Sequence, residues 1–481
     1  MIEGLLAAAA AVDGILWGPW TMAFIAVVAI YLGVRSGFFQ FRRFAFIWKN
    51  TLGSLFRGRK PGKSNKMTPF QATATALAST VGMGNIAGVG TALSVGGPGA
   101  IFWMWIFALL GMMTKTAEIT LAVHYRELDP HGNPHGGPMY YMRKALGWPF
   151  LAALFSLGVL INSLFTATLI QSHTVGRAFL KSYGINPYFT TGVLAAVTAV
   201  VIIGGIRRIG RFCERLVPMM SSIYIAGGLA LFILNSAQIP AVFSLIFRHA
   251  LAPAPAAGGF VGAAVAAALK NGMARGMLSN EAGLGTAPMV HATADTPHPF
   301  QQGLWGTVEV FFDTIVICTI TAFAVLSTGV LSGGESGIEL VIAAFATGFS
   351  PALAGALISV SILTFCLTTQ IGFFIYYETA ILNILGKKSM AYFRWLYLVP
   401  GVAFAGVADV DRLWVFANIS VGVCAVPNLV AVLALSGAFF KLKQDYLGGE
   451  NRYATDRVDT TRAYVRSASR PDMGRGLAPP P

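Results

Sequence analysis

Charged side chains are scarce in this sequence: they make up 11% of its 481 residues, whereas hydrophobic side chains make up 55%. With a mean hydropathy of +0.65, such a composition excludes an ordinary soluble globular protein. The apolar residues gather in long runs, each with the roughly 20 residues that a helix needs to cross a bilayer. We therefore predict an all-α polytopic membrane protein with about eleven spans. The predicted spans are 14–37, 67–95, 98–125, 149–180, 187–205, 215–235, 259–282, 303–328, 352–385, 392–408 and 412–440.

Cysteine is also sparse, with four residues in the chain. Cys213, Cys318, Cys366 and Cys424 fall within or beside predicted spans and show no metal-ligand spacing, so we interpret them as small buried hydrophobic residues. The start lacks the basic residues of a cleavable secretory leader, because Glu3 stands there instead. We therefore expect the first predicted span to stay in the mature protein.

Basic residues are unevenly distributed, although the formal net charge is +14. They are concentrated in loops around 35–66, 207–211 and 387–394, which is a topology signal and not the signature of a nucleic-acid partner. Basic loops mark the cytoplasmic side of a membrane protein. We therefore predict a protein embedded in the lipid bilayer with its N-terminus outside and its C-terminus inside. Segment 329–350, which has no basic residue, is then outside.

The spans suggest an internal repeat. Setting the first span aside leaves ten, which divide into two sets of five. Because five is odd, the second set enters the membrane from the opposite side, which predicts an inverted repeat. The predicted units are an N-terminal helix with a basic cytoplasmic loop, two repeats, and a polar tail that cannot bury enough apolar surface to fold alone. They cover residues 1–66, 67–240, 241–440 and 441–481.

The stretch TVGMGNIAGVG, residues 80–90, interrupts the first span of the first repeat with glycines. Unpaired backbone groups inside a bilayer are tolerated only where they line a cavity or meet a ligand. The half-helix ending near Val81 presents carbonyls that favour a cation, and the half-helix starting near Asn85 presents N–H groups that favour a carboxylate. A similar break is predicted in the second repeat at Asn271 and Gly272, whose carbonyls suit an ammonium group. Glycines that only allow tight helix packing are the alternative explanation.

The residues around both breaks resemble the alanine or glycine:cation symporter family, the sodium:alanine symporters. The resemblance runs from about Met67 to Leu435, and its motifs are TVGMGNIAGVGTAL, GGPGAIFWMW, NGMARGMLSNEAGLGTAP, HPFQQG and DTIVICTITA. It implies a leucine-transporter-type fold, with a five-plus-five inverted repeat, a discontinuous first helix in each repeat and one additional N-terminal helix. It also implies an integral protein of a bacterial cytoplasmic (inner) membrane.

The resemblance assigns roles to residues at matching positions. It implies that the substrate carboxylate lies on the backbone at Met83 and Gly84, with Asn85 beside it. It also implies that Gln171 hydrogen-bonds the substrate. Hydroxyl and carbonyl oxygens are hard, neutral ligands that suit sodium. The implied sodium site combines the hydroxyls of a threonine pair with two carbonyls of the first break, from Thr368, Thr369, Ala78 and Val81. Back-bonding of the threonines to their own helix is the alternative for that pair.

Two positions depart from the family's pattern. Phe373 stands where the family commonly has tryptophan, and Gln370 stands where it has an apolar residue. We expect both side chains to face the substrate. Because a phenyl ring removes a donor and frees volume while the glutamine adds polar capacity, the preferred substrate need not be plain alanine.

Ionisable residues within the spans are costly and point to function. We predict a salt bridge between Lys270 and Asp313, with a cation or proton site at Asp313 as the alternative. Lys115 and Glu118 lie one helical turn apart, so they are predicted to pair with each other. A cytoplasmic gate or a loop anchor is expected from three residues around the SNEAG block: Arg275, Asn280 and Glu281.

Together these features predict a secondary transporter and not an enzyme. We expect a sodium-coupled symporter that imports a small neutral amino acid, such as alanine or glycine, by alternating access. Sodium would be co-transported, and no organic cofactor is expected. A proton-coupled amino-acid permease of the same fold is the alternative. An intramembrane enzyme is remote because no Ser/Lys, Asp/Asp or HExxH constellation occurs at membrane depth, and a channel is remote because single breaks do not form repeated pore rings. The oligomeric state stays open.

Overall fold

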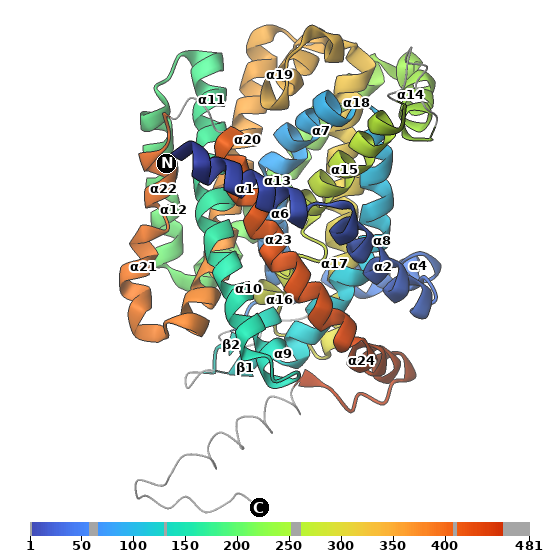
Figure 1. Ribbon diagram of the computed structural model, residues 1–481, viewed down its shortest axis with the longest axis vertical. Coiled ribbons are helices and arrows are strands. Elements are labelled where there is room, and N and C mark those ends of the chain that lie inside the picture. Colours follow the sequence, from blue (N-terminus) through green and yellow to red (C-terminus); the bar gives the residue numbers. More distant parts are fainter. Residues whose placement is uncertain (1, 57–65, 129–131, 252–260, 407–410, 456–481) are drawn as a thin grey trace, which may run out of the picture.

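The chain forms a bundle of helices in the computed structural model (Figure 1). The structure describes residues 2–56, 66–128, 132–251, 261–406 and 411–455. Within this part of the chain, seven helices are long and apolar enough to cross a membrane, or eight if one bent pair counts as a single span. The predicted all-α membrane fold is confirmed, whereas the number of about eleven spans stays a prediction.

Most predicted spans correspond to long helices or to helices joined end to end. In chain order these are α2 (Pro19–Arg35), α6 (Pro69–Thr80), η1 (Gly84–Gly88), α7 (Val89–Gly96), α8 (Gly99–His124), α10 (Pro149–Asn162), η2 (Ser163–Ile170), α11 (Gln171–Tyr183), α12 (Pro187–Ile203), α13 (Gly205–Leu234), α15 (Val261–Asn280), α17 (Pro299–Val310), η4 (Phe311–Cys318), α18 (Thr319–Thr328), α20 (Pro351–Ile384) and α23 (Asp411–Ala434).

Shorter elements connect and flank the long helices. They are α1 (Ile2–Leu16), α3 (Phe39–Arg42), α4 (Phe44–Asn50), α5 (Leu52–Leu55), β1 (Glu127–Leu128), β2 (Pro134–His135), α9 (Pro138–Lys144), η3 (Ser236–Gln238), α14 (Ile239–Leu251), α16 (Ala287–His291), η5 (Val330–Gly333), α19 (Gly337–Gly348), η6 (Lys387–Ser389), α21 (Met390–Leu396), α22 (Val399–Ala403) and α24 (Ser436–Gly448).

Local sequence signals explain where the main helices begin. Thr68 and Gln71 form a reciprocal capping box at the start of α6, which satisfies two backbone N–H groups that the first turn leaves free. Ser350 caps α20 by accepting from the Leu353 N–H at 3.3 Å. Proline stands at the first position of both helices, where its missing N–H costs nothing.

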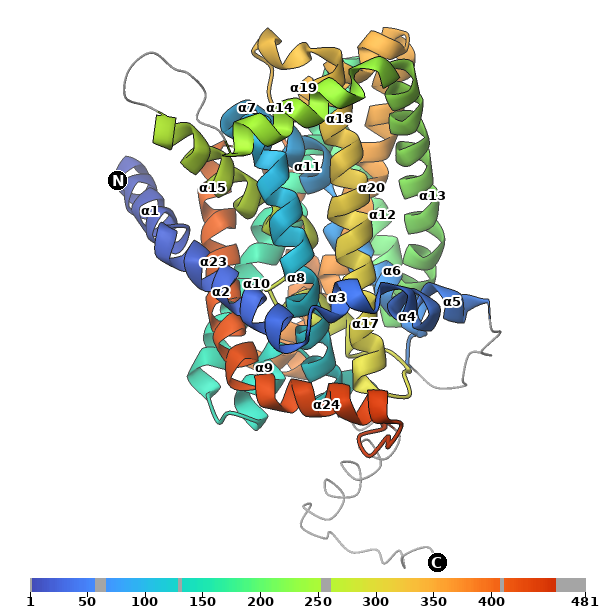
Figure 2. The same cartoon turned by 90° about the vertical axis from the view of Figure 1, so that its right-hand side faces the viewer.

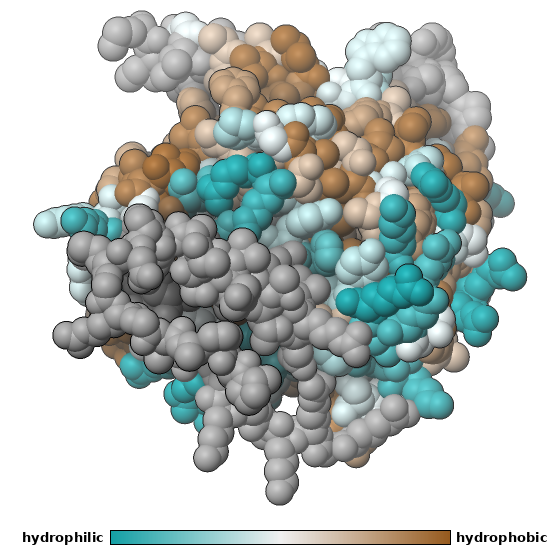
Figure 3. All heavy atoms as spheres, turned by 90° about the horizontal axis from the view of Figure 1, so that it is seen from below, coloured by the Kyte–Doolittle hydropathy of each residue, from teal (hydrophilic) through white to brown (hydrophobic). Residues whose placement is uncertain are grey.

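The two ends of the bundle differ in character (Figure 2). α14 and α19 lie across the upper end, whereas α24 lies across the lower end. Viewed from below, hydrophilic side chains gather on the lower face, with hydrophobic ones along parts of its edge (Figure 3). Large exposed hydrophobic residues on α2, α12 and α13 make the flanks apolar. Polar ends and apolar flanks fit a protein that spans a bilayer.

The structure corrects the predicted position of the second break. Asn271 and Gly272 lie inside the continuous helix α15, which extends to Asn280 before the chain unwinds. Gly272 is where α8 approaches α15, because a Cβ added there would lie 2.3 Å from the Ala100 carbonyl oxygen. This glycine therefore serves close helix packing, the alternative weighed for both breaks.

Two predicted boundaries also differ. The described part of the C-terminal tail is ordered as far as α24 and the residues after it, although residues 456–481 lie outside the described residues. Residues 207–211 form the first turns of α13 instead of a loop, because α12 ends at Ile203 and α13 begins at Gly205.

Replacing Gly272 by alanine tests the packing role. We expect Gly272→Ala to lower the thermal unfolding midpoint of the detergent-solubilised protein, because overpacking of this kind costs about 1–3 kcal/mol. Gly192→Ala on α12 is the matched control, since nothing lies within 4 Å of its added Cβ. An unchanged midpoint for Gly272→Ala would contradict the close approach of α8 and α15.

Candidate substrate and ion site

The first break separates α6 from η1 and α7, whose direction differs by 50°. The Gly82 N–H, which would donate to the Ala78 carbonyl in a continuous helix, donates instead to Asn85 Oδ1 at 2.9 Å. Val81 is extended at this point, with a ψ of 93°. The break therefore releases the Ala78 carbonyl from the helical ladder and leaves it available to a ligand.

The second break separates α15 from α16 and comprises residues 281–286. Glu281, Gly283 and Gly285 have φ angles of 54°, 91° and 81°, so the chain leaves the helical path three times within five residues. Glutamate in the left-handed region costs about 1–2 kcal/mol, which makes this position unusual. Asn428 on α23 holds the segment by donating to the Gly283 carbonyl at 2.9 Å. The predicted discontinuity of the second repeat therefore exists, but at the SNEAG block.

A buried carboxylate joins the two breaks. Asp313, in η4, accepts from Asn85 Nδ2 of the first break at 2.7 Å and from Ser279 Oγ at the end of α15 at 2.7 Å. Thr314 Oγ1 is a third donor at 2.8 Å, and Asn85 Nδ2 also donates to Ser279 Oγ at 2.9 Å. The side chain of Asn85 is therefore engaged with α15 and η4 and does not line the cavity between the breaks. Its role here is to hold the two breaks together.

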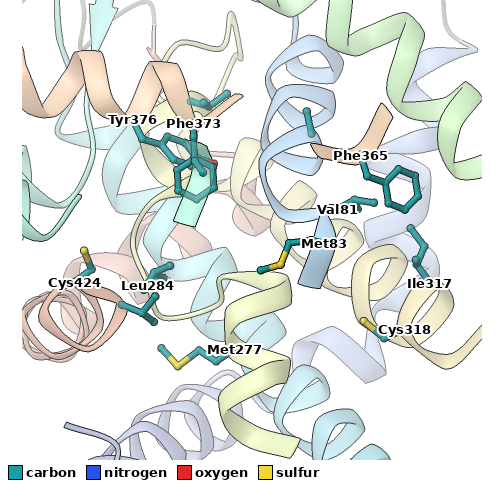
Figure 4. Packing of buried hydrophobic residues seen from close by; sticks show 14 of the residues in the cluster. Val81, Met83, Met277, Leu284, Ile317, Cys318, Phe365, Phe373, Tyr376 and Cys424 are labelled. Atoms are coloured by element: carbon teal, nitrogen blue, oxygen red, sulfur yellow. The ribbon is translucent and has the colours of Figure 1, made fainter. Parts of the chain in front are cut away.

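A cavity of about 20 Å³ lies between the two breaks. That volume is room for about one water molecule, so an amino acid enters only when the surrounding helices move apart. Figure 4 shows Met83 of the first break, Leu284 of the second and Phe373 of α20 around this region. The cavity is lined by Ser79, Thr80, Gly82, Met83, Gly84, Asn162, Thr166, Gln171, Leu278, Glu281, Leu284 and Phe373.

Four of the predicted substrate residues lie at the cavity: Met83, Gly84, Gln171 and Phe373. Gln171 Oε1 accepts the Met83 N–H at 3.4 Å, and its side chain also lies beside Gly82. Phe373 packs edge-on against Tyr376 with ring centroids 4.9 Å apart. The first break, an amide and an aromatic ring thus border one small space, which suits a small polar molecule.

The prediction that Gln370 faces the substrate is wrong. Its Nε2 donates to Ser172 Oγ at 2.8 Å, and its Oε1 accepts from Thr198 Oγ1 at 3.1 Å. These partners lie on α11 and α12, so the glutamine satisfies a polar contact between packed helices. Asn271 and Gly272 are also absent from the cavity lining, because α15 unwinds about two turns later than predicted.

The threonine pair on α20 divides between two environments. Thr368 Oγ1 donates back to the carbonyls of Thr364 at 3.0 Å and Phe365 at 2.9 Å. Thr369 Oγ1 is buried without a hydrogen-bond partner, and a Cβ added to Gly82 would lie 2.5 Å from it. The hydroxyl of Thr369 therefore faces the first break, where α6 ends. An unpartnered hydroxyl beside a broken helix end fits the donor set of a small hard cation.

The predicted Lys270–Asp313 salt bridge is not formed. Lys270 is exposed on the continuous part of α15, whereas Asp313 is buried among three uncharged donors. Lys115 lies 3.8 Å from Glu309 and donates to the Asn280 carbonyl at 2.9 Å.

Glu118 Oε1 accepts from Asn428 Nδ2 at 3.0 Å. The predicted pairing of Lys115 with Glu118 is therefore wrong, because each finds a partner on another element. Arg275 does not line the cavity, whereas Glu281, predicted with it as a gate, does.

Sequence reasoning missed four polar cavity residues on the first repeat: Ser79, Thr80, Asn162 and Thr166. Asn162 and Thr166 stand four residues apart where α10 passes into η2, so they share one helix face. Thr166 Oγ1 is buried without a hydrogen-bond partner. Polar residues repeated at this spacing inside an apolar span were the available signal.

The sodium:alanine symporter family model matches residues 3–460. The chain belongs to the sodium:alanine symporter family. It is 36% identical over 435 residues to a Methanococcus maripaludis protein named sodium/alanine symporter AgcS, covering 89% of this chain and 94% of that one. It is 37% identical over 443 residues to a Bacillus subtilis protein named probable sodium/glutamine symporter GlnT, covering 90% and 89% respectively.

The fold also resembles solved transporter structures. The manganese transporter of Eremococcus coleocola superposes with a TM-score of 0.55 at 14% identity, over 85% of this chain and 89% of that chain. The family and the fold together confirm a transporter with a leucine-transporter-type architecture, and not an enzyme. Membership of the family also places the chain among integral membrane proteins.

Substitution of Gly82 tests the geometry of the first break. Gly82→Ala brings a methyl group against the Thr369 hydroxyl, so we expect the maximal transport rate to fall at least about tenfold. Gly88→Ala in η1 is the control, since the nearest atom to its added Cβ is 3.9 Å away. The measurement is uptake of a radiolabelled family substrate into proteoliposomes. Equal rates for the two variants would contradict the contact between Gly82 and Thr369.

Proposed function

We propose that this family member is a sodium-coupled symporter that imports a small neutral amino acid by alternating access. The observation that supports this most strongly is the cavity between two broken helices, lined on one side by the backbone of Met83 and Gly84. The N-terminal end of a helix carries partial positive charge and attracts carboxylates. Gln171 Oε1 accepts from the Met83 N–H at this side of the cavity. We assign the Gln171 side chain as a hydrogen-bond partner for the substrate.

The apolar residues of the cavity lining, Met83, Leu278, Leu284 and Phe373, support a substrate with an uncharged side chain. One relative is named for alanine and another for glutamine. We propose alanine, glycine or a similar residue as the preferred substrate of this chain. Gln370 does not extend the polar lining toward a longer side chain, because it points to α11 and α12.

Sodium is the proposed co-transported ion. The proposed ligands are the Thr369 hydroxyl, the Thr368 hydroxyl and the carbonyls of Ala78 and Val81. The unpartnered Thr369 hydroxyl and the released Ala78 carbonyl support this set, because both are neutral oxygens at the same broken helix end. Sodium bound there would neutralise the carbonyl end of α6 and thereby hold the break in the shape that binds substrate.

The two repeats are proposed to cover 67–240 and 241–440, with the basic lower end of the bundle on the cytoplasmic side. α24 and α9, with its basic last turn, lie at this end (Figure 2). The N-terminus would then be outside and the C-terminus inside the cytoplasmic (inner) membrane of a bacterium.

Transport by purified protein in proteoliposomes tests the function. We expect radiolabelled alanine to accumulate under an inward sodium gradient, and neither under a proton gradient alone nor without a gradient. Glycine should compete. Uptake driven by the proton gradient alone would contradict sodium coupling, and the absence of alanine uptake under every gradient would contradict the proposed substrate.

Thr369→Ala tests the sodium site. We expect the apparent KM for sodium to rise about tenfold, the equivalent of about 1.4 kcal/mol, because one hard ligand is lost. Thr364→Ala, one turn earlier on α20, is the control, since that hydroxyl is satisfied by the Val360 and Ser361 carbonyls. An unchanged sodium KM in Thr369→Ala would remove this hydroxyl from the ion site.

A further inference from the structure

Glu281 is the one acidic side chain that lines the cavity among the described residues. It is 2% exposed, so its carboxylate is buried. Oε2 accepts from Thr286 Oγ1 at 2.6 Å. No other hydrogen bond or ion pair to this carboxylate is formed by the described residues. One carboxylate oxygen is thus left to meet whatever occupies the cavity.

The neighbouring basic group, Lys115, forms no direct ion pair with Glu281 among the described residues. Lys115 lies against Glu309 and the Asn280 carbonyl, and Glu309 is in turn bonded to His291 Nε2. A buried carboxylate without a cationic partner is costly, because burial removes its hydration. A cation in the same cavity, or a proton on the carboxylate, would offset that cost.

The backbone holds Glu281 in a costly conformation to reach this place. Its φ of 54° is left-handed, although glycine adopts such angles more readily and stands two residues later. The Ala282 N–H donates to Asn280 Oδ1 at 2.9 Å, and the Thr286 hydroxyl fixes the carboxylate. Strain kept in place by surrounding contacts is typical of ligand sites.

The cavity therefore has two ends of opposite character. The helix start that follows the first break favours a carboxylate, whereas the Glu281 carboxylate favours a cation. We propose that Glu281 binds the ammonium group of the transported amino acid, so that the two breaks recognise the two charges of one zwitterion. This assignment rests on the proposed function, and it makes Glu281 a specificity residue for α-amino acids over other small carboxylates.

Competition between alanine and lactate tests the proposal. Lactate keeps the carboxylate and methyl group of alanine and replaces the ammonium by a hydroxyl. In sodium-driven alanine uptake by the wild-type protein, we expect the inhibition constant of L-lactate to exceed the KM for alanine by at least about a hundredfold. The ratio of these two constants is the alanine-to-lactate preference. Glu281→Gln should raise the alanine KM at least about tenfold without weakening inhibition by lactate, since the lost interaction is charge-assisted. The ratio of the two affinities is a readout that a merely structural role would not change.

Two further variants keep the test decisive. Glu281→Asp retracts the carboxylate by one methylene and should lower the alanine-to-lactate preference, as Glu281→Gln does. This variant provides the test if Glu281→Gln folds poorly. Glu378→Gln removes a carboxylate of α20 that lies outside the cavity, beside Arg394, and should leave that preference unchanged. Folding of each variant is checked by its elution profile and thermal midpoint in detergent.

The outcomes separate this inference from the proposed function. Absence of alanine uptake by the wild-type protein would overturn the proposed function itself. Normal wild-type uptake together with an unchanged alanine-to-lactate preference in folded Glu281→Gln or Glu281→Asp would overturn the role of Glu281 alone. A changed sodium KM with an unchanged preference would also overturn it, and would assign the carboxylate to the ion instead.

Discussion

The carboxylate of Asp313 is the contact on which the site depends. Two helices are interrupted inside a low-dielectric bundle, where each unsatisfied backbone group costs several kcal/mol. Asn85 satisfies the freed N–H of Gly82 with its oxygen and donates to Asp313 with its nitrogen. Ser279 brings the end of α15 to the same carboxylate. Neither break can shift without disturbing the other, because both are tied to one acceptor on η4.

The Asp313 network satisfies the polar groups that hold the two breaks in place. Other buried polar groups have no hydrogen-bond partner within the described residues. Among the buried side-chain groups that meet no hydrogen-bond partner within the described residues, the Thr369 and Thr166 hydroxyls lie at or beside the cavity, where Glu281 also has one carboxylate oxygen without a hydrogen bond. Buried polar groups are nearly always hydrogen-bonded in native proteins. Groups left over at a cavity between broken helices are therefore best explained as ligand-binding groups.

The sequence predicted the first break and misplaced the second for a physical reason. At the first break, two glycines and Asn85 stand together, and the asparagine supplies the cap that an unwound strand needs. Gly272 carries the same local signal, but its lack of a side chain serves the approach of α8 at Ala100, which is a tertiary contact. The true second break includes a glutamate in the left-handed region, and local preference argues against that conformation.

The direction in which a side chain points was the other feature that could not be predicted from the sequence. Phe373 and Gln171, which family resemblance assigned to the substrate, both line the cavity. The resemblance did not indicate that Gln370, three residues from Phe373 on the same helix, points to α11 and α12, since that depends on how α20 is rotated within the bundle. Lys115 likewise bonds across helices to Glu309 and not along its own helix.

The position of the cavity also bears on how it would open. Its lining comes from two groups of elements: the breaks, which Asp313 holds together with η4, and the facing residues of α10, η2, α11 and α20. Hydrogen bonds to Asp313 join the two breaks to each other, whereas the Met83 N–H donates to Gln171 across the cavity between the two groups. Under alternating access, relative rocking of the groups would enlarge the cavity without breaking the Asp313 network. The same carboxylate that stabilises the interrupted helices would thus allow them to move as one body.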